Sequence, residues 1–151
     1  MVIGNRLTNN GLPGVAMHSH APNQNLDDTR IIGNYIAGNG ADTGDAATPG
    51  PTGINVFGVT PITGTVISHN VIDKEAVDIA IKTGALVAAQ LNNLVGKRIG
   101  VDNLGTGPVD ASENWWGCTK GPGGRGCTTV SGANVTTTPF LTQPVQSAGP
   151  N

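Results

Sequence analysis

One short unit recurs along this chain and limits the folds that the chain can adopt. The unit is an apolar residue, two variable residues, an asparagine, one variable residue and a second apolar residue. Its clearest copy is Ile67-Ser68-His69-Asn70-Val71-Ile72. The five copies that we recognise place their asparagines at Asn5, Asn34, Asn70, Asn93 and Asn114. Their spacings of 29, 36, 23 and 21 residues are typical of a repeat architecture.

A fixed asparagine between two apolar runs has a physical explanation. Asparagine tolerates left-handed backbone angles, and its amide bonds to the backbone of a tight turn. If successive copies stack, the amides also bond to one another in a ladder. We therefore expect these asparagines to lie one above another, at a turn that all copies share.

We call this six-residue repeat the Asn unit. A second apolar segment, in which apolar residues alternate with others, follows the Asn units and predicts a half-buried strand. We align these segments so that they form two inward rows of side chains. The first row is Val15, Ile54, Val77 and Ile99, and the second is Met17, Val56, Ile79 and Val101. The outward rows are then Ala16, Asn55, Asp78 and Gly100, and His18, Phe57, Ala80 and Asp102. Since every copy runs in the same chain direction, the strands are predicted to pair in parallel.

Composition narrows the class of protein further. Charged residues make up 12% of the chain, against about 25% in ordinary globular proteins. The net charge is −2 and no basic stripe exists, which argues against nucleic-acid binding. No apolar run is as long as a membrane span. Met1 leads straight into an apolar unit without a signal peptide, so we interpret the chain as a fragment of a longer protein.

The end of the chain departs from the repeat. Trp116 takes the position of Val95 in the preceding copy, and we expect its ring to cover the open end of the core. A Gly-rich loop then joins Cys118 to Cys127, which are the only two cysteines. We expect a disulfide between them, which would indicate an oxidising compartment. A pair of metal ligands is the alternative, although a zinc site needs further ligands.

By this point the residues resemble the right-handed parallel β-helix proteins of the pectate-lyase-like superfold. The resemblance rests on the Asn units and on the ending Glu113-Asn114-Trp115-Trp116-Gly117, followed by Gly121-Pro122. It implies an all-β solenoid of about four to five rungs. We assign residues 1–117 to the rungs and residues 118–151 to a capping loop and tail. Members of this superfold include polysaccharide lyases, glycoside hydrolases, epimerases, adhesins and phage tailspikes, so the fold does not select a function.

The acidic residues leave open whether the chain is an enzyme. Lyases of this fold use clustered Asp residues for calcium and an Arg or Lys base, whereas hydrolases use several Asp residues close together. The outward rows do not stack two carboxylates on adjacent rungs. Asp78 and Lys82 form a weak candidate acid/base pair, and a solvated surface pair is the commoner arrangement.

Seven residues are candidates for ligand binding: His18, His20, Asp27, Asp28, Asn55, Asp78 and Trp115. His18 and His20 share one face of a strand, and Asp27 or Asp28 would complete a metal site with them. Calcium is a further alternative, with oxygen ligands from Asp27, Asp28, Asp42 and Asp45. The chain lacks a D-x-D-x-D-G loop, so we expect no cofactor.

The function that we expect is non-catalytic. The chain would be part of a secreted or cell-surface bacterial β-helix protein that serves as a scaffold or contacts carbohydrate. The alternative is part of a polysaccharide lyase or glycoside hydrolase whose catalytic acids lie mostly outside these residues. The expected partners are a polysaccharide or cell-surface glycan and, at the uncapped first rung, a second copy of the chain.

Overall fold

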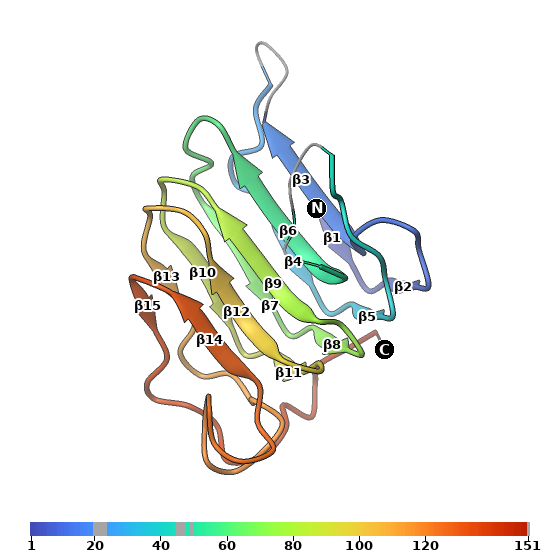
Figure 1. Ribbon diagram of the computed structural model, residues 1–151, viewed down its shortest axis with the longest axis vertical. Helices are drawn as coiled ribbons and strands as arrows, with labels where there is room; N and C mark the ends of the chain where they lie inside the picture. The colour runs from blue at the N-terminus through green and yellow to red at the C-terminus, as the bar shows by residue number, and fades with distance from the viewer. Residues whose placement is uncertain (20–23, 45–47, 49, 151) are drawn as a thin grey trace.

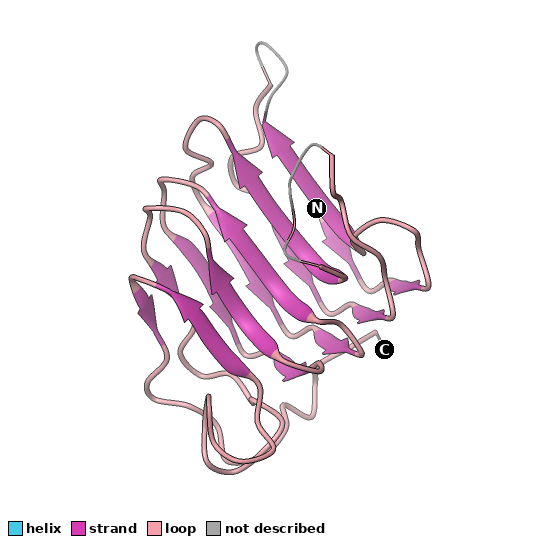
Figure 2. Cartoon of the chain, in the orientation of Figure 1, coloured by secondary structure: helices cyan, strands magenta, loops and turns pink. Residues whose placement is uncertain are grey.

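The computed structural model describes residues 1–19, 24–44, 48 and 50–150. These residues form three parallel β-sheets, and no helix occurs among them (Figure 1; Figure 2). Sheet A contains β1 (Val2–Ile3), β4 (Arg30–Ile32), β7 (Thr65–Ser68), β10 (Val87–Gln90), β13 (Val109–Asp110) and β15 (Val135–Thr136). Sheet B contains β2 (Arg6–Thr8), β5 (Tyr35–Ala37), β8 (Val71–Asp73) and β11 (Asn93–Val95). Sheet C contains β3 (Val15–Ser19), β6 (Thr52–Gly58), β9 (Val77–Lys82), β12 (Ile99–Asn103) and β14 (Thr129–Gly132).

The order of the strands explains why all the pairs are parallel. The chain passes through sheets A, B and C in turn with β1, β2 and β3, and β4 to β12 repeat this order three times. After β12, β13 lies in sheet A, β14 in sheet C and β15 in sheet A. No strand pairs with its neighbour in the chain; each pairs with its counterpart in the next copy of the repeat. The all-β, parallel architecture is thus confirmed, and the arrangement is consistent with a β-solenoid (Figure 1).

An asparagine ladder runs along the turn between sheets A and B. In each step the side-chain Nδ2 and the backbone N–H of one asparagine both donate to Oδ1 of the next. The Nδ2–Oδ1 distances are 3.0 Å for Asn5–Asn34, 2.9 Å for Asn34–Asn70, 2.9 Å for Asn70–Asn92 and 3.1 Å for Asn92–Asn114. The four asparagines after the first are fully buried, so these bonds satisfy polar groups that water does not reach.

The fourth member of this ladder is Asn92, and our assignment of Asn93 was wrong by one residue. The inward position of that copy belongs to Ala89, which is fully buried, and not to Gln90. Gln90 faces outward, and its amide donates to Asp110 and Ser112. The apolar residue after the ladder is therefore Leu94, which pairs with Ile72. Trp116 takes the position of Leu94, not of Val95, because Trp115 bridges to Asn93.

The predicted core is nearly complete in the structure. Seven of the eight predicted residues are buried, and the exception is Ile99, which is half-buried as the first residue of β12. Trp116 is fully buried within the same hydrophobic cluster. The inward rows are filled mainly by β-branched side chains, which pack well on a pleated surface.

One register differs from the prediction. Ile54 pairs with Ile79, and Val77 pairs with Thr52, so β9 is displaced by two residues from our alignment. A displacement of two keeps the same side chains inward, because the side-chain period of a strand is two. It changes the outward rows, which become Ala16, Asn55, Ala80 and Asp102, and His18, Phe57 and Lys82.

The C-terminal tail turns back along the edge that carries the Asn ladder. The N–H of Leu141 donates to the carbonyl of Asn114 at 3.0 Å. The side chain of Asn93 exchanges two hydrogen bonds with the backbone of Val145, at 3.0 and 2.8 Å. Further on, the N–H of Gly149 donates to the carbonyl of His69 at 2.8 Å. The tail therefore crosses the last three copies of the repeat in the direction opposite to their stacking.

At the other end, β1, β2 and β3 each lie at an edge of their sheet. Ile3 and Leu12 are 48% and 58% exposed there. Exposed edges of this kind favour association with another chain, and the predicted end-to-end contact between copies stays a prediction.

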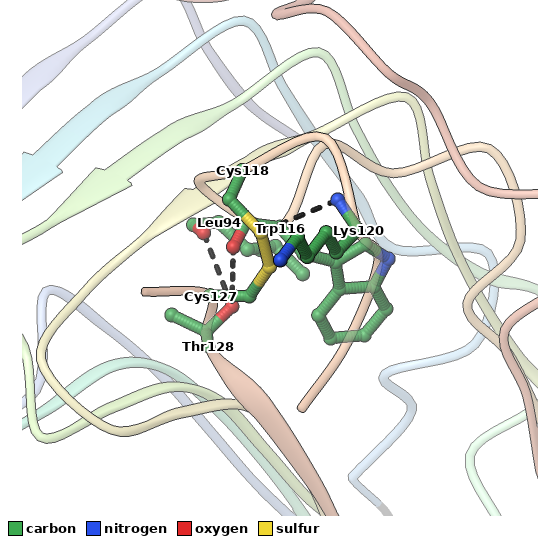
Figure 3. Close-up of a disulfide and its surroundings, with 6 residues drawn as sticks. All are labelled: Leu94, Trp116, Cys118, Lys120, Cys127 and Thr128. Atoms are coloured by element: carbon green, nitrogen blue, oxygen red, sulfur yellow. Dashed lines mark hydrogen bonds between the residues drawn. A yellow bond between two sulfur atoms is a disulfide. The ribbon is translucent and has the colours of Figure 1, made fainter. Parts of the chain in front are cut away.

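Cys118 and Cys127 form a disulfide, as predicted, with their Cα atoms 5.1 Å apart. That separation lies within the usual range for a bridged pair. The bridge lies beside Trp116 and Thr128 (Figure 3). The Thr128 hydroxyl donates to the carbonyl of Leu94 at 3.2 Å, and Cys127 packs against the core cluster. The loop is thus attached to the last copies of the repeat and not only closed on itself.

Replacing both cysteines by serine (Cys118→Ser with Cys127→Ser) should lower the free energy of unfolding by about 2.5–3 kcal/mol. The physical reason is that a closed loop of this length restricts the unfolded chain. Urea unfolding without reductant measures the difference. The wild-type protein in reductant is the control, and it should unfold like the variant. Equal stability of the oxidised wild type and the variant would contradict the prediction.

Candidate functional site

The structure does not bring all seven predicted ligand-binding residues together. His18, Asn55 and Asp78 lie on three neighbouring strands of sheet C: β3, β6 and β9. Trp115 is half-buried next to β11 in sheet B. His20 lies outside the described residues. Sheet C is therefore the face on which a candidate site can be built.

Asp27 and Asp28 have structural roles in the turn before β4. The Asp27 carboxylate accepts a hydrogen bond from the N–H of Thr63 at 2.7 Å. Asp28 has a φ of 56°, and its N–H donates to the carbonyl of Thr63 at 2.9 Å. The calcium alternative also included Asp45, which the structure does not describe. Within the described ranges, no group of three or more His, Cys, Asp or Glu side chains is arranged to hold a metal ion.

The outward row of His18, Phe57 and Lys82 on sheet C combines an aromatic ring with two basic side chains. Phe57 lies between His18 on β3 and Lys82 on β9. The His18 and Phe57 ring centroids are 5.7 Å apart, and Lys82 Nζ lies 5.2 Å from the Phe57 centroid. Asp42, from the loop before β6, places a carboxylate oxygen 3.5 Å from His18 Nε2. The row presents a half-exposed ring with cationic or hydrogen-bonding groups on both sides.

The other outward row, which contains Asn55, Ala80 and Asp102, has polar side chains that are almost completely buried. Asn55 on β6 and Asp102 on β12 are 3% and 4% exposed, and Ala80 on β9 separates them. Asn55 Nδ2 and Asp102 Oδ1 have no hydrogen-bond partner among the described residues. A buried polar atom without a partner costs about 1–3 kcal/mol, so Asn55 Nδ2 and Asp102 Oδ1 are among the polar atoms of sheet C that lower the stability of the fold.

A hollow adjoins the row of His18, Phe57 and Lys82, where the strands of sheet C end. It has a volume of about 310 Å³, and Lys82 is part of its lining. Val59 and Leu104, which are 70% and 45% exposed, form apolar walls. Gly84 and Gly105 also line this hollow. The accessible surface of the candidate site therefore runs from His18 across Phe57 and Lys82 into this hollow.

Two buried acids lie where sheet B passes into sheet C. Asp78 and Glu75 are both fully buried. Asp78 Oδ2 accepts a hydrogen bond from the N–H of Gly96 at 3.2 Å, while Oδ1 has no partner among the described residues. A Cβ at position 96 would overlap Asp78 Oδ1, so glycine is required there to accommodate the carboxyl.

Burial raises the pKa of both carboxyls. For Asp78 the pKa lies well above its ordinary value because of desolvation, with the negative charges of Glu75 and Asp73 adding to the effect and the Gly96 N–H opposing it. For Glu75 the pKa is also raised by desolvation, against hydrogen bonds from Asn39 and the positive charge of Lys97. Neither carboxyl is accessible to a substrate in this arrangement.

The proposed pairing of Asp78 with Lys82 was therefore wrong. The two residues are four positions apart on β9, which corresponds to about 13 Å along a strand. Asp78 is fully buried under Gly96, whereas Lys82 is exposed and lies over Phe57. The displacement of β9 also puts Ala80, and not Asp78, next to Asn55.

Sequence reasoning missed Glu75, although a signal for it was present. Asn10 and Asn39 each follow a ladder asparagine by five residues, and Glu75 follows Asn70 by the same number. The structure shows a second ladder at these positions: Asn10 donates to Asn39 at 2.8 Å, and Asn39 Nδ2 donates to Glu75 at 2.8 Å. The constant spacing identifies the turn that leads into sheet C.

Comparisons with family models, with curated proteins and with solved structures find no match for this chain. Among the described residues, no helix is long and apolar enough to cross a membrane.

Proposed function

We propose that the chain belongs to a secreted or cell-surface protein with the right-handed, pectate-lyase-like β-helix fold that its sequence resembles. In this proposal it acts as a rigid scaffold, closed at the C-terminal end by Trp116 and the bridged loop, whose sheet C face contacts a carbohydrate without cleaving it. The disulfide supports an oxidising compartment, which suits a secreted protein.

The observation that carries the proposal is the row of His18, Phe57 and Lys82. An aromatic ring offers an apolar face to a sugar ring, and flanking polar groups fix the orientation of the ligand. Cation–π contact holds Lys82 beside the ring in the free protein. The strands that carry the row are paired on both sides or packed on the core, so the contact residues are held on rigid elements.

A non-catalytic role is favoured over hydrolysis by the state of the acids. Glycoside hydrolysis needs two carboxyl groups that flank the bond to be cleaved. On the sheet C face Asp78 is inaccessible, and Asp102 is almost completely buried. The alternative, that the chain is part of a lyase or hydrolase whose catalytic acids lie mostly elsewhere, predicts new unsaturated or reducing ends when the protein is incubated with polysaccharides.

Phe57→Ala should weaken carbohydrate binding by about tenfold or more, because an aromatic anchor typically carries at least 1–2 kcal/mol of a binding interface. A glycan array identifies a ligand, and affinity electrophoresis with that ligand compares the variants. Trp115→Ala is the matched control, since it removes a half-buried aromatic ring next to sheet B. Circular dichroism verifies that both variants fold.

The outcomes separate the two aromatic candidates. Loss of binding in Phe57→Ala with normal binding in Trp115→Ala supports the sheet C face. The reverse result would transfer the contact to Trp115 and overturn the proposal. Binding to no glycan on the array would also overturn it and leave the scaffold role alone.

A further inference from the structure

A small hollow on the outer face of sheet B brings two cations together. It is lined by Arg6, Thr8, Asn9, Tyr35, Ala37 and Lys74. Arg6 on β2 pairs with Tyr35 on β5, and Thr8 pairs with Ala37. Lys74 directly follows β8, the next strand of the sheet. The hollow is thus built from three adjacent copies of the repeat and lies on a different sheet from the row of Phe57.

The side chains of this hollow are held by contacts of their own. The Arg6 guanidinium carbon lies 4.4 Å from the centroid of the Tyr35 ring. The Tyr35 hydroxyl donates to Asp73 Oδ2 at 3.4 Å, which fixes the ring from its other end. Lys74 has a φ of 62°, a left-handed conformation, at the turn that follows β8. Cation–π contact leaves the N–H groups of a guanidinium free to bind an oxyanion.

Both cations lack an acidic partner among the described residues. In the part of the chain that the structure describes, neither Arg6 nor Lys74 makes an ion pair. None of the eight Lys and Arg residues makes an ion pair within the described residues, so what distinguishes Arg6 and Lys74 is that they line one small hollow together. The nearest carboxylate by hydrogen bonding is that of Asp73, which accepts from Tyr35. Two cations and one carboxylate leave a local charge of +1.

We propose that Arg6, Tyr35 and Lys74 form a binding site for a single monoanionic oxyanion group, a carboxylate or a sulfate ester, that is carried by a glycan. The guanidinium fork matches the geometry of such a group. The hollow has a volume of about 150 Å³, below the roughly 300 Å³ of pockets that enclose a whole ligand. It therefore takes one charged group and leaves the rest of the ligand on the surface. The local charge of +1 favours one negative charge over the dense charge of a nucleic acid.

A glycan is a better carrier than a peptide because of the remaining lining. Thr8 supplies a hydroxyl and Asn9 an amide beside the cations, and both groups suit the hydroxyls that surround an acidic group on a sugar. An acidic peptide would bring apolar side chains, for which this hollow offers only Ala37 and the Tyr35 ring, and the Arg6 guanidinium already lies over that ring. This site does not depend on the proposed contact at sheet C.

The test uses carboxymethyl dextran and unmodified dextran, which differ only in the carboxylate groups. Binding is measured by calorimetry at about 10 mM ionic strength, where screening is weak. We expect the wild-type protein to bind carboxymethyl dextran more tightly than dextran. Arg6→Gln and Lys74→Asn should each weaken that binding about fivefold, the effect of losing one exposed charge contact. Asparagine suits the left-handed φ at position 74, so this variant keeps the backbone.

Matched variants and a second polymer make the outcomes decisive. Arg125→Gln removes an exposed cation from the disulfide loop and should leave binding unchanged, while Arg6→Lys should restore part of it. Equal binding of the two dextrans, or unchanged binding in both Arg6→Gln and Lys74→Asn, would overturn the proposal. Binding of poly-glutamate as tight as that of carboxymethyl dextran would overturn the choice of a glycan. Any binding that Phe57→Ala removes belongs to sheet C instead.

Discussion

Asn70→Ala should lower the free energy of unfolding by about 3–5 kcal/mol, measured by urea unfolding. The Asn70 side chain makes four hydrogen bonds: Oδ1 accepts from the backbone and side chain of Asn34, and Nδ2 donates to Ile31 O and to Asn92 Oδ1. The backbone N–H of Asn70 also donates to Asn92 Oδ1, at 3.0 Å, and this bond remains in the variant. Asn34, Asn70 and Asn92 are all fully buried. Alanine would leave buried donors and acceptors without partners, and each such group costs about 1–3 kcal/mol.

Asn5→Ala is the matched control for this prediction. Asn5 is the first member of the same ladder, but it is exposed, so water replaces the lost bonds. Its replacement should cost less than about 1 kcal/mol. The ladder explanation predicts a large difference between the two variants. Equal effects at both positions would mean that the ladder stabilises the turn only through local backbone conformation.

The same ladder shows how much of the fold was predictable from the sequence. The spacing of the asparagines and the period of two in the following segments were sufficient to predict parallel strands and most of the core. These features are predictable because an inward position tolerates only apolar residues, and a buried turn needs a side chain that satisfies the backbone. Ile54, Val56, Ile79 and Val101 all face inward as expected.

The two errors have a common physical origin. Asn92 and Asn93 are adjacent, and residue type alone does not identify which of them enters the ladder. Ile79 and Val77 are both apolar and both inward, so a displacement of two residues leaves the hydrophobic pattern unchanged.

The candidate site was less predictable than the core, because outward positions are not constrained by packing. The register error placed Asp78 next to Asn55, whereas Ala80 occupies that position. The predicted register did not place Lys82 in the row of Phe57, whereas in the structure the two residues pair. Arg6 and Lys74 are 68 positions apart in the sequence. Only the stacking of three copies of the repeat shows that both residues line one hollow.

Asp78→Asn should raise the free energy of unfolding at pH 9 by roughly 2–4 kcal/mol, the scale of the penalty for an unpaired buried charge. Asp78 is fully buried, with one hydrogen bond from Gly96 and one oxygen without a partner among the described residues. Asparagine has the same shape and carries no charge. Its carbonyl oxygen keeps the bond from Gly96, and its amide takes the place of the protonated carboxyl oxygen.

The direction of the pH dependence follows from the raised pKa values of Asp78 and Glu75. A carboxyl whose pKa is higher in the folded state than in the unfolded state binds its proton more tightly when folded. Its stabilising contribution is therefore complete below the unfolded pKa and is lost as the pH rises through the folded pKa. The wild-type protein should become less stable as the pH rises above about 4, the unfolded pKa of a carboxyl, opposite to the usual acid denaturation by paired carboxylates.

Urea unfolding at a series of pH values tests both parts of this prediction. Asp78→Asn should flatten most of the decline, and the part that remains should come from Glu75, whose pKa responds to Asn39, Lys97 and Asp73. Asp110→Asn serves as a control, because Asp110 is a half-buried acid on sheet A that bonds to Ser112 and Gln90. Stability that rises with pH in the wild type, or an equal decline in the wild type and Asp78→Asn, would show that Asp78 is not the buried acid that destabilises the ionised protein.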